Sequence, residues 1–198
     1  MRATDILFEE HRIIMKVLEC LQRIVEEAEG NGRLNGESAD TALDFFRNFA
    51  DGCHHAKEED RLFVVLEEQG IPREGGPIGV MLMEHDHGRR YVRGMADSAE
   101  KATQGEPQAI QSFAENARDF MVLLRNHIDK EDQVLFPMAV ETLRDQAKQA
   151  LFFDFKRIEA EAGGKRHSHY LEVARKLCEQ YGVDFVDENQ IQTLLHEF

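Results

Sequence analysis

Two stretches of sequence, HHAKEEDRLF at residues 54–63 and HIDKEDQVLF at residues 127–136, decide the fold of this chain. Each begins with a histidine, places a glutamate four positions later and ends in a Leu-Phe pair. A Glu-His dipeptide is also repeated, at residues 10–11 and 84–85, and all these matched positions are 73 or 74 residues apart. Several motifs that recur at one period indicate an internal duplication. The sequence therefore predicts that one helical unit, repeated once, makes up most of the chain.

The apolar residues around these motifs follow helical spacing. Between residues 4 and 29 the apolar positions are separated alternately by four and three residues, which is the pattern of one helix face, and His11 lies within this stripe. The same pattern predicts further helices over residues 38–69, 78–103 and from 107 onward. Four helices with short connections favour an all-α, up-down-up-down four-helix bundle built from a duplicated helical hairpin.

Three local signals predict where these helices begin, end or bend. We expect Thr4 to cap the first helix, because a threonine oxygen can accept a hydrogen bond from the first turn. The segment Gly30-Asn31-Gly32 is expected to end that helix. Pro137 lies inside the apolar pattern of the fourth helix and should kink it or end its regular hydrogen bonding.

The chain is expected to divide into two parts. Residues 1–150 form the predicted bundle, and residues 151–198 form a helical extension that packs on the bundle as a cover. After the pair Gly163-Gly164, the extension is predicted to contain helices at about Ser168–Tyr181 and Asn189–His196.

Composition excludes several classes of protein. The 198 residues suffice for one domain with a sizeable core. With 24 Lys+Arg and 38 Asp+Glu the formal net charge is −14, which disfavours nucleic acid as a partner. No apolar run reaches the roughly 20 residues that a membrane-spanning helix needs, and the N-terminus lacks a secretory signal pattern. The three cysteines, Cys20, Cys53 and Cys178, are too scattered for a disulfide framework, so we expect a soluble, cytoplasmic protein.

The bundle topology brings the repeated polar residues to one depth. In each hairpin, the leg from the first histidine up to the turn and the leg back to the second histidine contain similar numbers of residues. At a rise of roughly 1.5 Å per residue, both legs have nearly the same length. Six side chains are therefore predicted to converge inside one end of the bundle: His11, His54, Glu58, His85, His127 and Glu131.

Buried imidazoles and carboxylates in this number indicate a metal site. Their desolvation would cost several kcal/mol unless cations neutralised the carboxylates. Imidazole combined with carboxylate suits iron or manganese, and two glutamates can bridge two ions that each have two histidines. The lack of cysteine ligands argues against a structural zinc site.

The ligand register has an alternative. His55 and Glu59 have the same spacing as His54 and Glu58, so a register shifted by one residue is possible. The match of His54 and Glu58 to the second repeat favours the unshifted register.

Other polar residues near the motifs have two interpretations each. Glu10 and Glu84 precede ligand candidates and either orient neighbouring ligands or carry charge on an exposed face. His167 and His169 either hang over the site or belong to a solvated tail, which we favour. His87 is expected at the surface.

Taken together, the motifs resemble the hemerythrin-like (HHE) cation-binding proteins over roughly residues 4–150. The resemblance rests on His11, HHAKEE at 54–59, Glu84-His85 and HIDKED followed by Leu135-Phe136-Pro137. It implies a non-haem centre of two iron ions that reacts with O2, NO or peroxide, with an electron-donor protein as a further partner. By position, it implies that His11 and His54 serve one iron, that His85 and His127 serve the other, and that Glu58 and Glu131 bridge them.

Two positions bear on this resemblance. Hemerythrins proper take their bridge from the position of Asp132, but Glu131 is preferred here because a four-residue step turns only about 40° from His127, whereas five residues turn about 140°. Oxygen-carrying hemerythrins have a histidine four positions after the one at His85, where this chain has Arg89. We therefore expect one iron to lack a terminal nitrogen, with Arg89 either pairing a nearby carboxylate or lying at the surface.

The resulting expectation for function is redox chemistry, detoxification or sensing of a small molecule rather than oxygen transport. An oxidoreductase that acts on peroxide or NO is one protein that would fit this expectation. The alternative is an iron-storage or iron-responsive module without turnover.

Overall fold

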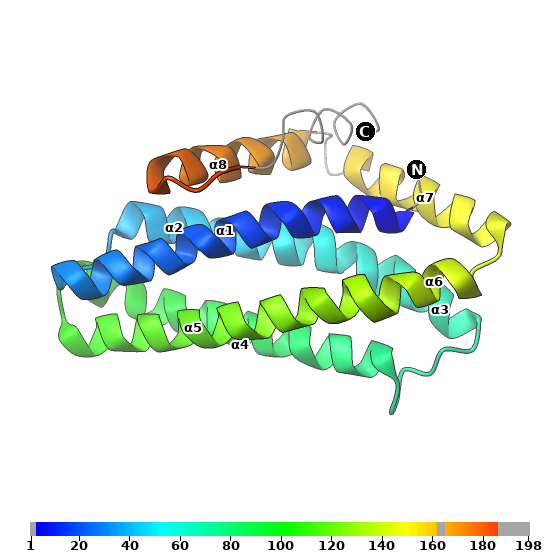
Figure 1. Cartoon of the computed structure of the whole chain (residues 1–198), viewed down its shortest axis with the longest axis horizontal. Coiled ribbons are helices and arrows are strands. Elements are labelled where there is room, and N and C mark those ends of the chain that lie inside the picture. Colours follow the sequence, from blue (N-terminus) through cyan, green and yellow to red (C-terminus); the bar gives the residue numbers. More distant parts are fainter. Residues whose placement is uncertain (1–2, 162–164, 186–198) are drawn as a thin grey trace.

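The computed structural model describes residues 3–161 and 165–185, and within these ranges every regular element is helical. Figure 1 shows long helices lying side by side along one axis. The predicted all-α bundle is confirmed.

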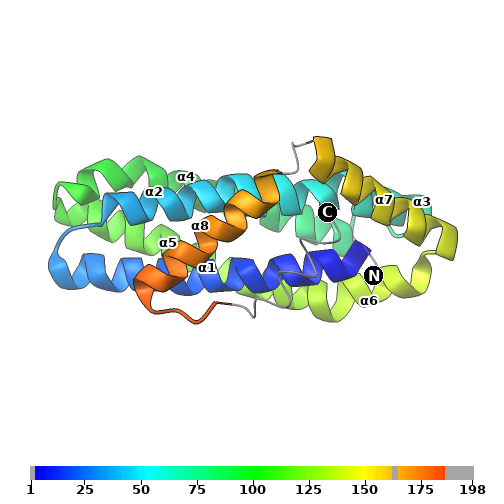
Figure 2. The same cartoon turned by 90° about the horizontal axis from the view of Figure 1, so that it is seen from above.

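Four helical rods form the bundle. The first is α1 (Ala3–Asn31). The second runs through α2 (Gly36–Phe45), η1 (Phe46–His55), η2 (Glu58–Leu62) and α3 (Phe63–Glu68). The third is α4 (Pro77–Thr103), and the fourth runs through α5 (Pro107–Lys130), η3 (Glu131–Leu135) and α6 (Phe136–Thr142). Successive rods are antiparallel, as Figures 1 and 2 show.

The turns at the end of the bundle far from the polar motifs are set by local chemistry. The side chain of Asn35 accepts a hydrogen bond from the Ser38 N–H at 3.2 Å and so caps α2. The Leu34 N–H donates to the Ala102 carbonyl at 3.0 Å, which ties the first turn to the end of α4. Gly105 has φ +85°, a conformation that favours glycine, and Pro107 then starts α5. The expected cap at Thr4 is wrong, because Thr4 lies inside α1 and is buried.

Three segments of π-helix, η1, η2 and η3, interrupt the second and fourth rods. The Ala56, Phe63 and Phe136 N–H groups each donate to the carbonyl five residues back, at Asp51, Glu58 and Glu131 respectively. The sequence predicted one uninterrupted helix over residues 38–69, and this is where the structure differs. In the fourth rod the irregular turn directly precedes Pro137, where a break in regular hydrogen bonding was expected. Such π turns occur frequently at functional sites.

The core of the bundle consists of two apolar clusters with a polar layer between them. The larger cluster includes Ile14, Phe49 and Leu124, and the smaller one includes Leu7 and Phe63. Every rod passes from one cluster to the other, and the repeated histidines and glutamates lie at the crossing. Because burial of a large apolar side chain contributes about 1.5–3 kcal/mol, the two clusters can stabilise the fold on either side of this layer.

Two helices follow the bundle. α7 (Asp145–Glu161) was not predicted from the sequence, although its buried Leu151 and Phe155 follow helical spacing. α8 (Lys165–Tyr181) corresponds to the helix expected at Ser168–Tyr181 and crosses over α1 and α2 (Figure 2). Side chains of α7 belong to the smaller cluster and side chains of α8 to the larger one. The expected Gly163-Gly164 break and the helix at Asn189–His196 lie outside the described residues.

None of the helices in the described part of the chain is long and apolar enough to cross a membrane.

Replacing Asn35 with alanine should lower the free energy of unfolding by about 1 kcal/mol, because the Ser38 N–H loses its acceptor. Urea denaturation followed by circular dichroism measures this change. The matched control, Asn35→Ser, keeps an acceptor and should retain most of the stability. An unchanged midpoint in Asn35→Ala would contradict the role of this cap.

Candidate metal centre

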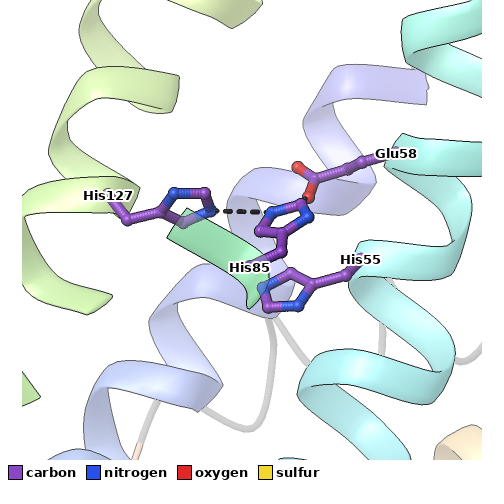
Figure 3. Close-up of side chains that lie close together, drawn as sticks. All are labelled: His55, Glu58, His85 and His127. Atoms are coloured by element: carbon purple, nitrogen blue, oxygen red, sulfur yellow. Dashed lines mark hydrogen bonds and ion pairs between the residues drawn. The ribbon is translucent and has the colours of Figure 1, made fainter. Parts of the chain in front are cut away.

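All six predicted residues meet in the polar layer between the two apolar clusters. Two groups of side chains have ligand atoms within 4.8 Å of one another, and both groups include Glu58. The first group is His55, Glu58, His85 and His127, drawn in Figure 3, and the second is His11, His54, Glu58 and Glu131. All these residues are buried.

The two glutamates each reach histidines of both hairpins. Glu58 places one oxygen 3.6 Å from His54 Nε2 and the other 3.5 Å from His85 Nε2. Glu131 does the same toward the other pair, at 3.2 Å from His11 Nε2 and 3.3 Å from His127 Nε2. Each carboxylate thus presents one oxygen to each half of the duplicated bundle, which is the arrangement a bridging ligand needs.

His55 is the ligand candidate that the sequence reasoning left out of its set. The two registers were treated as alternatives, but η1 and the turn after it bring His54 and His55 to the layer together. The His55 ring stacks on His85 with centroids 3.8 Å apart. The repeat hid this residue, because its counterpart in the second motif is Ile128. The adjacent pair of histidines was the signal that could have revealed it.

The Nδ1 atom of each of these histidines lies at a carboxylate outside the layer. The partners are Asp132 for His11 at 2.6 Å, Glu59 for His85 at 2.7 Å, Glu10 for His54 at 3.0 Å, Glu84 for His127 at 3.0 Å and Asp51 for His55 at 3.3 Å. A neutral imidazole that donates from Nδ1 directs the lone pair of Nε2 into the layer. Of the two interpretations of Glu10 and Glu84, the structure therefore favours the one in which each carboxylate orients a histidine.

This outer layer of carboxylates follows the duplication. Glu10 contacts Lys57 on the second rod, and Glu84 contacts Lys130 on the fourth. Lys57 is fully buried, so the Glu10 carboxylate faces a cation without water between them. Each lysine neutralises a carboxylate whose second oxygen holds a histidine.

The inner atoms fit a bound cation. Both oxygens of Glu58 and of Glu131 and the Nε2 atom of His55 are buried without a hydrogen-bond partner of acceptable geometry. His85 Nε2 and His127 Nε2 lie only 3.0 Å apart, as Figure 3 shows. With both Nδ1 protons directed to carboxylates, the two facing nitrogens present lone pairs to each other, which is unfavourable unless a proton or a cation lies between them. Cations bound within the two groups would satisfy these atoms.

The electrostatics of the ligands are consistent with this fit. Burial and the nearby Glu131 raise the pKa of Glu58 well above its usual value. Burial alone would also raise the pKa of Glu131, but His127 and His11 lower it to about 2. Burial lowers the pKa of His54 to about 3, and burial with the neighbouring imidazoles lowers the pKa of His85 further. Neutral imidazoles at neutral pH are the form that binds metals.

Comparison with protein families agrees with this geometry. Residues 2–139 match the model of the family described as "Hemerythrin HHE cation binding domain". The chain belongs to this family. No curated protein and no solved structure matches the chain in the same comparisons. The hemerythrin HHE match covers the four rods through most of α6, which are the elements that carry the two ligand groups.

Arg89 belongs to the outer layer of this hemerythrin HHE domain. Its guanidinium donates to Asp51 at 2.7 Å and to Glu59 at 2.6 Å, and its side chain is 32 % exposed. Asp51 and Glu59 in turn hold His55 and His85. The expected pairing of Arg89 with a carboxylate is therefore present in the structure.

The sequence analysis expected the metal ion near His85 to lack a nitrogen ligand. The structure shows otherwise. His55 from the second rod brings a third imidazole to His85 and His127. The group with two histidines is the other one, His11 and His54. The packing of the second rod against the third thus brings in an imidazole, which the third rod does not provide because it has Arg89 in place of a histidine.

His167 corrects a further expectation. The sequence favoured a solvated tail, but His167 is 2 % exposed and its Nε2 lies 3.3 Å from Glu10 Oε1. Its ring also packs near Phe49 at 5.3 Å between centroids. The reason is that α8 lies across the bundle instead of extending into solvent. His169 is exposed, and His87 is partly exposed and lies outside both ligand groups.

Metal loading should release a proton from His11. Burial lowers the pKa of this histidine, but Asp132 and Glu131 together raise it to about 9, so the ring of the metal-free protein is protonated at pH 7. A metal at Nε2 must displace that proton, so the apparent affinity should rise as the pH increases from 7 toward 9. Anaerobic calorimetry with Fe²⁺ in buffers of different ionisation enthalpy measures the proton release. A pH-independent affinity would contradict a role for His11 in binding.

Asp132→Asn should weaken metal binding by roughly 10–100-fold, the usual cost of losing a carboxylate that orients a ligand histidine. Asp129 is a matched control, because it is exposed, lies three residues away and pairs with Gln133 instead of a histidine. Asp129→Asn should leave the affinity unchanged. Equal affinities of the two variants in a competition assay with a chelator would refute the orienting role of Asp132.

Proposed function

We propose that this hemerythrin HHE domain holds two iron ions and that its reduced centre reacts with O2, NO or peroxide. The observation that carries the proposal is the pair of ligand groups that share Glu58. Imidazole and carboxylate ligands suit iron, and the bundle core is a common place for such centres. When bound, the two irons supply the electrons for reduction of a small oxidant.

The ligands divide unequally between the two ions. His55, His85 and His127 would serve one ion and His11 and His54 the other, and Glu58 and Glu131 each place one oxygen near a histidine of each group. Neither ion would receive six protein ligands, so each would keep a position for a small exogenous molecule. Incomplete coordination by the protein supports reaction with a small ligand over a purely structural role for the metal.

The chain's own residues control water and protons around the centre. The apolar clusters above and below the layer restrict access of water along the bundle axis. The carboxylates at the Nδ1 atoms hold the imidazoles in one orientation and stabilise positive charge on the centre. Glu58, whose carboxyl is protonated more readily than usual, can hold a proton until a metal binds.

Iron content of the variants tests the ligand assignment. The wild-type chain, reconstituted anaerobically, should contain two irons, and Glu58→Ala or Glu131→Ala should contain fewer than two because each removes a shared carboxylate. His87→Ala, outside both groups, is the control and should keep both irons. Elemental analysis with a protein assay gives the ratio. Two irons retained in both glutamate variants would refute the assignment.

An optical titration tests the reactivity. Oxygen is admitted to the reduced, iron-quantified protein while its spectrum is recorded. A charge-transfer band that vanishes on deoxygenation indicates reversible binding, as in sensing, and conversion to a stable oxidised spectrum indicates that O2 acts as an oxidant. In the second case, consumption of peroxide or NO with an added electron donor is measured next. An iron-loaded protein that reacts with none of these would contradict the proposal and favour an iron-storage or iron-responsive module.

A further inference from the structure

A cavity of about 210 Å³ adjoins the three-histidine group. It is bounded by η1, α4 and α5, and its lining includes His55, His85 and His127. Its lining also includes Arg47, eight residues before His55 on η1, and Arg93, eight residues after His85 on α4, which are both exposed. The cavity therefore leads from the surface of the bundle to the candidate metal centre.

The middle of the cavity is apolar. Its walls there are formed by the side chains of Phe46, Val92, Phe120, Leu123 and Leu124. Gly88 on α4 also lines it, and a Cβ atom at this position would lie 3.5 Å from the Phe120 ring. The missing side chain keeps open a space that a larger residue would fill. An apolar group of a ligand fits these walls better than water does.

Within the described part of the chain, two of the arginines that line the cavity have no carboxylate partner. The Asp51 carboxylate is already bound by Arg89, and the Glu84 carboxylate contacts Lys130. By contrast, no carboxylate among the side chains that the structure describes pairs with Arg47 or Arg93. On a chain of net charge −14, two exposed arginines that pair with none of the described carboxylates are a local feature that attracts an anion.

We propose that this cavity binds a small amphipathic carboxylate, with its apolar tail between Phe46 and Phe120 and its carboxylate at Arg47 and Arg93. The volume lies below the roughly 300–1,000 Å³ of sites for drug-sized ligands, which favours a medium-length tail. A route for a neutral gas alone has no need of two arginines at its mouth. The tail points toward His55 and His85, so an organic carboxylate is the substrate class for the centre.

The role as substrate rests on the proposed iron chemistry, but binding of the carboxylate depends on the chain alone. The probe is octanoate, titrated calorimetrically into the full-length chain with and without iron. Octanoate should bind with one site per chain in both forms. Octanol and octylamine, which have the same tail without the negative charge, should bind at least about tenfold more weakly because they cannot form charge-assisted hydrogen bonds with arginine.

Two variants separate the charged mouth from the apolar interior. The double variant Arg47→Gln/Arg93→Gln should weaken octanoate binding by about tenfold and leave octanol binding unchanged. Arg23→Gln is the control, because Arg23 is an exposed arginine on α1 that does not line the cavity. Leu123→Trp, at a partly exposed position that tolerates a larger ring, should block both probes. Circular dichroism of each variant establishes that it is folded.

Several outcomes would overturn the inference. These are equal affinity for octanoate and octanol, unchanged octanoate binding in the double arginine variant, or no octanoate binding to a folded wild-type chain. Binding to the iron-loaded form alone would also overturn it, because octanoate would then be a metal ligand. Iron content is measured on the same samples, so failure of the two-iron proposal and failure of carboxylate binding are distinguished.

Discussion

The structure depends on one constraint, which is that imidazoles and carboxylates lie buried between two apolar clusters. Such groups are tolerated in a core when each polar atom has a partner. On the outside, the Nδ1 atom of each of the five histidines in the two ligand groups lies at a carboxylate, and two of those carboxylates contact a lysine. On the inside, the oxygens of Glu58 and Glu131 face imidazole nitrogens across distances that a cation would fill. The outer carboxylates fix the orientation of the imidazoles, and the inner oxygens and nitrogens are the atoms that can bind a cation.

The duplication explains why the layer is nearly symmetric, and its exceptions explain why the two ligand groups differ. His11 and His85, Glu10 and Glu84, and Lys57 and Lys130 hold equivalent places in the two hairpins. His55 breaks the symmetry, because the second hairpin has an isoleucine there. Arg89 breaks it again by binding the carboxylates that hold His55 and His85. The cavity that Arg47 and Arg93 line lies on this same side of the layer.

α8 contacts the groups around the layer although it lies outside the family match. α8 contributes Tyr170 to the larger apolar cluster, and the Tyr170 hydroxyl donates to Asp44 at 3.0 Å. His167 on the same helix reaches Glu10, the carboxylate that orients His54. The docking of α8 is thereby connected to a ligand of the two-histidine group by one intervening carboxylate.

The sequence by itself determined the helical class, the duplication and the six residues that meet in the polar layer. Periodicity and the 73-residue repeat carry this information, because a side chain's depth in an antiparallel bundle follows from its distance to the turn. It did not determine the π turns that bring His54 and His55 to the site together, since these turns come from hydrogen bonds within a packed rod. Nor did it determine the burial of His167 or the partners of Arg89, which are contacts between segments far apart in the chain. Local spacing fixes which face of a helix a residue occupies, but the packing of helices against one another decides what that face meets.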